Sequence, residues 1–157
     1  MYDFSADDVF EMAEQLERNG GKFYRSAMEK VDEEENKNLL RMLAEMEDEH
    51  EKTFATMRAE LMADEKSATV FDPEDESFLY LRALADRRVF SDKEIDISST
   101  REILKAAIQA EKDAIVFFLG MKEAVPTDKG KGQMETIIKE EMGHIRLLSS
   151  HLANLKK

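Results

Sequence analysis

Residues 137–148 read IIKEEMGHIRLL, and residues 43–54 read LAEMEDEHEKTF. Both stretches carry a glutamate three residues before a histidine, as Glu47 before His50 and Glu141 before His144. Apolar residues flank each pair at helical spacing, and residues at positions i and i+3 share one face of an α-helix. Each stretch therefore predicts a helix whose inward face carries a carboxylate and an imidazole.

The two stretches belong to a longer internal repeat. Sliding the chain by 94 residues places Glu47 on Glu141 and His50 on His144, and it also places Glu17 on Glu111. Apolar or aromatic positions coincide under the same shift: Ala13 with Ala107, Phe23 with Phe117, Tyr24 with Phe118 and Leu43 with Ile137. The sequence therefore predicts one helical hairpin that occurs twice.

Apolar spacing and helix-start signals divide the chain into four long helices. They are expected over about 5–31, 33–63, 100–125 and 132–156, with a crossover over 64–98 that carries a short helix. Asp32 with Glu35 and Ser99 with Glu102 resemble capping boxes, and residues 127–132 are expected to form a loop. We therefore predict a single all-α domain over 1–157, a four-helix bundle of ferritin-like connectivity whose long crossover joins helices 2 and 3.

The spacing of the acids predicts that they meet. Glu17 and Glu47 are equidistant from Asp32, and Glu111 and Glu141 are equidistant from Pro126. Each carboxylate thus lies about 15 residues, or roughly 22 Å of helix, from the turn of its hairpin. In antiparallel hairpins this brings all four carboxylates and both histidines to one level in mid-bundle.

Composition limits the classes of site and partner. The chain has no cysteine, which excludes disulfides, thiolate metal sites and iron–sulfur clusters. A net charge of −12 argues against nucleic-acid and membrane partners, and the start of the chain lacks the features of a signal peptide. We expect a cytoplasmic protein in which most of the 35 acidic residues solvate helix faces.

Four ionised carboxylates in a bundle core would be prohibitively costly unless they were protonated, paired or coordinated to cations. We therefore predict a dimetal site. Carboxylate-rich ligation with one imidazole for each metal suits iron or manganese. The predicted ligands are Glu17, Glu47, His50, Glu111, Glu141 and His144.

The same residues, with Phe23-Tyr24 after Glu17 and Phe117-Phe118 after Glu111, resemble the ferritin-like superfamily and within it the rubrerythrin-like proteins. The resemblance covers nearly the whole chain. It implies two iron ions bridged by Glu47 and Glu141, with Glu17 and Glu111 as terminal ligands and one histidine on each metal. It also implies a homodimer.

Two departures from the rubrerythrin pattern bear on activity. The cysteine-built rubredoxin site is missing, so electrons would come from an external donor protein. Ala114 stands where rubrerythrins carry an extra glutamate that takes part in redox-linked iron movement. The favoured reading is an oxidoreductase acting on peroxide or oxygen. The alternatives are iron oxidation with storage or sequestration, and a non-catalytic dimetal module holding iron, manganese or mixed metals.

Two residues near the predicted ligands stay open at this point. Tyr24 could hydrogen-bond beside the cluster or relay an electron, although a satisfied core aromatic is the more common case. His151 follows His144 on nearly the same face but has no partner in the repeat, which favours a surface role over ligation.

Overall fold

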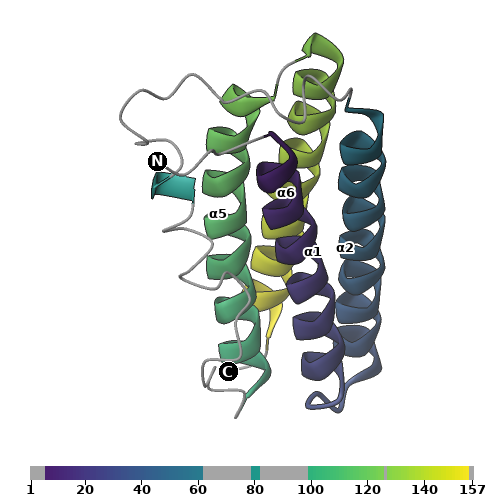
Figure 1. Ribbon diagram of the computed structural model, residues 1–157. Coiled ribbons are helices and arrows are strands. Elements are labelled where there is room, and N and C mark those ends of the chain that lie inside the picture. Colours follow the sequence, from purple (N-terminus) through teal and green to yellow (C-terminus); the bar gives the residue numbers. More distant parts are fainter. Residues whose placement is uncertain (1–5, 62–78, 82–98, 126, 156–157) are drawn as a thin grey trace.

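The computed structural model describes residues 6–61, 79–81, 99–125 and 127–155. Four long helices, α1 (Ala6–Met28), α2 (Glu34–Glu60), α5 (Thr100–Ala124) and α6 (Asp128–Asn154), run side by side as a bundle (Figure 1). Among the described residues, none of the helices is long and apolar enough to cross a membrane. The all-α prediction is confirmed. The predicted crossover over 64–98 lies outside the described residues except for 79–81.

The helices pair as two hairpins. The contacts between α1 and α2 and between α5 and α6 are the most extensive, and α1 with α5 and α2 with α6 make smaller contacts. In the first hairpin the guanidinium of Arg58, near the end of α2, forms two hydrogen bonds of 2.8 Å to Asp7 and one of 2.9 Å to Glu14. This fork ties the end of α2 to the start of α1, as planar guanidinium groups do with carboxylates.

The predicted helix starts differ from the structure at two places. Ser99 accepts a hydrogen bond from the backbone N–H of Glu102, as predicted, but the cap of α2 is Glu33 rather than Asp32, and its side chain makes no capping hydrogen bond. Helix α6 begins at Asp128, before the predicted start near 132. The reason is that the side chain of Thr127 accepts a hydrogen bond from the N–H of Gly130, which satisfies a first-turn donor and keeps both following glycines in the helix.

Helix α1 continues through Asn19, Gly20 and Gly21 without a break, and both glycines are buried. The helix faces that meet inside the bundle are apolar. Their largest fully buried side chains include Phe10, Tyr24, Phe54, Phe117 and Phe118. Burying such side chains stabilises the fold by about 1.5–3 kcal/mol each. This packed interior surrounds the polar residues described next.

Candidate metal centre

All six predicted ligands lie inside the bundle. Glu17 on α1, Glu47 and His50 on α2, Glu111 on α5, and Glu141 and His144 on α6 are each at most 4% exposed. Their ligand atoms form two groups, each with atoms within 4.8 Å of one another. One group comprises Glu17, Glu47, His50 and Glu141, and the other comprises Glu47, Glu111, Glu141 and His144. Glu47 and Glu141 belong to both groups, as bridging ligands would.

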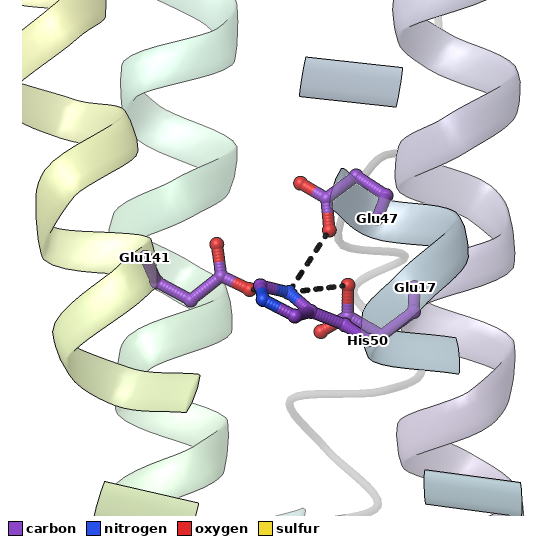
Figure 2. Close-up of side chains that lie close together, drawn as sticks. All are labelled: Glu17, Glu47, His50 and Glu141. Carbon is purple, nitrogen blue, oxygen red and sulfur yellow. Dashed lines mark ion pairs between the residues drawn. The ribbon is translucent and has the colours of Figure 1, made fainter. Parts of the chain in front are cut away.

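In the first group, the Nδ1 atom of His50 faces three carboxylates. It lies 2.9 Å from Glu141 Oε1, 3.5 Å from Glu17 Oε2 and 3.9 Å from Glu47 Oε2. Figure 2 shows these side chains pointing toward one another, with Glu141 reaching from α6 toward the imidazole and Glu17 and Glu47 approaching from the first hairpin. The three oxygens thus gather around one ring nitrogen.

The second group repeats this geometry in the other hairpin. His144 Nδ1 lies 2.8 Å from Glu141 Oε2, 3.4 Å from Glu111 Oε1 and 3.7 Å from Glu47 Oε1. The two imidazole rings are nearly parallel, at an interplanar angle of 18° and with 5.7 Å between their centroids. Glu141 thus presents one oxygen to each imidazole and is the nearest carboxylate to both, whereas Glu47 lies farther from each.

The cluster leaves many polar atoms without a hydrogen bond. Within the described part of the chain, both oxygens of Glu17, both of Glu141 and the Nδ1 atoms of both histidines are buried and lack a hydrogen-bond partner. Buried polar atoms in native proteins are nearly always satisfied, so such a concentration needs an explanation. Cations fit this arrangement, because the unsatisfied atoms are carboxylate oxygens and imidazole nitrogens that converge.

In the metal-free protein, bound protons neutralise most of the buried carboxylates. Burial and the charge of Glu141 raise the pKa of Glu17 well above its usual value, and burial and the charge of Glu17 do the same to the pKa of Glu47. Burial and the charge of Glu141 raise the pKa of Glu111 to about 7. Most of this carboxylate cluster is therefore held toward its neutral form.

The pKa values of Glu141 and the two histidines shift toward the charged form of each group. Burial opposes charge on all three groups, but their mutual attraction outweighs it. The neighbouring carboxylates raise the pKa of His50 to about 9 and that of His144 to about 10, and the two imidazoles hold the pKa of Glu141 well below its usual range. The metal-free core thus holds two imidazolium cations around one ionised glutamate. Metal binding would displace their protons, since only a neutral imidazole is a ligand.

The rubrerythrin family profile matches residues 8–152, which is most of the chain and includes all six residues of the cluster. The chain belongs to the rubrerythrin family. A crystal structure of a protein from Thermotoga maritima, described as ferritin-like and diiron-carboxylate, superposes with a TM-score of 0.72 at 24% identity over 98% of each chain. That likeness confirms the ferritin-like fold. No curated protein matches the chain.

In this rubrerythrin-family chain, two described side chains outside the cluster, Tyr24 and Glu140, form hydrogen bonds with its ligands. The hydroxyl of Tyr24 donates a hydrogen bond of 2.5 Å to Glu111 Oε1. Burial and the charge of Glu111 raise the pKa of Tyr24 well above its usual value, so the phenol stays protonated and continues to donate. Of the two possibilities raised for Tyr24, hydrogen bonding beside the cluster is the one that the structure contains.

The second outer contact was not predicted from the sequence. Glu140, on α6, lies 2.6 Å from His50 Nε2 through its Oε2 atom, while its side chain is 46% exposed. A carboxylate only accepts at that position, so the imidazole N–H donates. Its sequence signal is weak, because Glu140 is one more acid on the polar face of its helix and the repeat places Met46 at the equivalent position.

A surface cavity of about 480 Å³ adjoins the second histidine. Its lining includes Met46 of α2 and Glu140, Gly143 and His144 of α6. The buried His144 ring is therefore the part of the cluster that borders this cavity. His151 belongs to neither ligand group.

Proposed function

We propose that this protein binds two iron ions in the glutamate–histidine cluster and uses them to reduce peroxide or oxygen, with electrons from an external donor protein. The observation that carries the proposal is the doubled site in which Glu47 and Glu141 are shared. Shared glutamates would hold two cations close enough to act on one small oxidant together.

Charge and donor type support this metal content. Four ionised carboxylates in the cluster, Glu17, Glu47, Glu111 and Glu141, balance two divalent cations in full. One imidazole and several carboxylate oxygens for each metal favour iron or manganese over structural zinc, and no cysteine is present to recruit softer ions. Iron is proposed over manganese because the similar protein from Thermotoga maritima is described as diiron-carboxylate.

Two ferrous ions would supply two electrons, the number that hydrogen peroxide takes up with two protons when it is reduced to two water molecules. The protein's own side chains hold the ligands and limit water access. Tyr24 holds the Glu111 carboxylate, and the buried apolar residues around the cluster exclude bulk water. The cavity beside His144 offers a small oxidant an approach to the edge of the cluster.

The electrons must be replenished from outside the chain. Without cysteines there is no rubredoxin-type iron site, so a separate reductase or small electron-transfer protein completes the cycle. The homodimer implied by the family resemblance is part of the same proposal. Light scattering coupled to size-exclusion chromatography tests it.

Stopped-flow oxidation of the protein loaded anaerobically with two ferrous ions tests the proposed activity. We expect rapid oxidation by hydrogen peroxide, with two ferrous ions consumed for each peroxide, and slower or comparable oxidation by oxygen. A matched Glu47→Gln variant, which lacks one shared carboxylate, should lose the rapid phase.

The other readings give different results in this assay. Continued oxidation of many ferrous ions per chain, together with assembly into a large shell, would identify iron storage instead. A protein that binds metal but stays ferrous with both oxidants would be a dimetal binding module, and the oxidoreductase proposal would be wrong.

A further inference from the structure

The repeat fails at one contact beside the cluster. Glu140 on α6 approaches His50 on α2, and the 94-residue shift converts this pair into Met46 on α2 and His144 on α6. A thioether is only a weak acceptor, whereas a carboxylate accepts strongly from an imidazole N–H. The two histidines therefore share Glu141 as the nearest carboxylate on their inner faces but differ on their outer faces.

His50 is held from both sides. Its Nδ1 faces the cluster, 2.9 Å from Glu141, and its Nε2 donates to Glu140 at 2.6 Å. A proton kept on Nε2 leaves Nδ1 as the ligand nitrogen of the neutral ring. The hydrogen bond thus selects the tautomer that binds metal, fixes the ring orientation and makes Nδ1 a stronger donor.

His144 lacks this support. Its Nδ1 faces Glu141 at 2.8 Å in the same way, but its buried Nε2 has no hydrogen-bond partner among the described residues. Met46 lines the cavity beside this ring. In the part of the chain that the structure describes, no hydrogen bond comparable to that of Glu140 selects the tautomer or orientation of the His144 ring.

The hydrogen bond from Tyr24 should also weaken metal binding at the His144 group. The phenol donates to Glu111 Oε1 and so draws electron density from a carboxylate that belongs to the His144 group. Phe118 occupies the repeat-equivalent position and has no hydroxyl to offer Glu17. The His144 group therefore has the weaker imidazole and the weaker terminal carboxylate.

We propose that the two metal positions are unequal and that Glu140 is the positioning residue that makes the Glu17–His50 position the tighter one. The inference rests on the metal binding in the proposed function. It extends that function by assigning an order of loading, with the Glu17–His50 position filled first. Outer carboxylates of this kind change metal affinity by about 10- to 100-fold.

Anaerobic calorimetric titration of the chelator-treated protein with Co²⁺ tests the order without any turnover. We expect two binding steps that differ in affinity in the unmodified protein. Glu140→Gln should weaken the tighter step by about tenfold or more and leave the weaker step unchanged. Glu49→Gln is a matched control, because it removes a neighbouring exposed acid that contacts Lys52 rather than a histidine.

A double-mutant comparison separates positioning from a general loss of charge. In a His50→Ala background one weaker step should remain, and adding Glu140→Gln should not change it. In a His144→Ala background the tighter step should remain, and Glu140→Gln should weaken it as in the full protein. A structural or purely electrostatic role would weaken binding in both backgrounds.

The repeat also supplies a gain-of-function variant. Met46→Glu places a carboxylate where the repeat predicts a partner for His144 Nε2, and the adjoining cavity gives the new side chain room. We expect the weaker step to become tighter by about tenfold. Combining Met46→Glu with Glu140→Met should reverse the order of the two steps.

The outcomes distinguish this inference from the proposed function. Two equal steps, or an effect of Glu140→Gln that persists in the His50→Ala background, would overturn the inference while leaving a dimetal protein. A protein that binds no Co²⁺, Mn²⁺ or Fe²⁺ at the cluster would overturn the proposed function, and the inference with it.

Discussion

The hydroxyl of Tyr24 on α1 donates to Glu111 on α5 over 2.5 Å, so a hydrogen bond to a proposed metal ligand also joins the two hairpins. Contacts between α1 and α5 are far fewer than those within each hairpin. A buried hydrogen bond at this place therefore contributes to the docking of one hairpin on the other as well as to the orientation of Glu111.

Replacing Tyr24 with phenylalanine should destabilise the metal-free protein. The ring remains, but a buried carboxyl loses its donor, which costs about 1–3 kcal/mol. Denaturant unfolding of the chelated protein measures the loss, and Tyr80→Phe, at a side chain 47% exposed, is the control that should change little. Equal stability of both variants would show that this hydrogen bond adds nothing to hairpin docking.

Two glutamates of the same cluster should respond in opposite ways when the metal is removed. Glu17 is buried with both oxygens unsatisfied, so Glu17→Leu should stabilise the metal-free protein by about 1–3 kcal/mol. Glu141 is the counterion of two buried imidazoles, so Glu141→Gln should destabilise it by about 3–5 kcal/mol.

Both variants are compared by denaturant unfolding at neutral pH with a chelator present, and both should bind less metal than the unmodified chain. If Glu17→Leu raises and Glu141→Gln lowers the free energy of unfolding while both variants bind less metal, the cluster is retained for metal binding at the expense of stability. A loss of stability in Glu17→Leu would contradict this, because it would mean that Glu17 is satisfied in the metal-free core.

The cluster could be predicted from the sequence because each ligand position occurs twice, once in each repeat. Glu17 alone is one acid among 35. The 94-residue shift places it on Glu111, and each of the two lies 15 residues from the turn of its hairpin, which predicts its height along the bundle axis. Glu140 could not be found this way. Its contact with His50 joins different hairpins, and the repeat offers Met46 in its place.

The start of α6 was predicted wrongly for a local reason. Gly130 and Gly132 lower helix propensity, and their spacing with lysines resembles a loop. A single side-chain cap at Thr127 and the burial of Gly130 outweigh that preference. The predicted cap at Asp32 was wrong by one residue, because the extended backbone at Glu33 begins α2 without any capping side chain.

These two glycines should differ when each is replaced with alanine. A Cβ at Gly132 would meet nothing within 4 Å, so Gly132→Ala should stabilise the protein by about 1 kcal/mol through helix propensity alone. A Cβ at Gly130 would lie 2.5 Å from Val125 Cγ1 and 3.0 Å from the capping Thr127 Oγ1. Gly130→Ala should therefore destabilise it by about 1–3 kcal/mol. Thermal unfolding of the pair measures both, and a gain in Gly130→Ala would show that the cap is dispensable.

The metal-free protein should lose stability as the pH rises from about 6 to about 9. The pKa values of His50, His144 and Glu111 are raised in the folded protein to about 9, 10 and 7, above the usual 6.5 for histidine and 4.5 for glutamate. The folded state therefore binds more protons than the unfolded chain throughout this window. The stability contributed by the histidine protons is complete near pH 6 and declines as each imidazole is titrated, whereas the contribution of Glu111 already declines above about pH 4.5.

Metal loading should reverse the trend, since the bound form holds deprotonated ligands and binding releases protons, so that affinity rises with pH. The difference in Tm between loaded and chelated protein should accordingly widen from pH 6 to pH 9. Repulsion among the acidic side chains of a chain of net charge −12 would also lower stability as the pH rises. The His144→Gln variant separates the two causes, because it removes one buried imidazole and leaves that repulsion in place. The chelated variant should show a shallower decline than the unmodified chain, and an unchanged slope would assign the pH dependence to the surface rather than to the cluster.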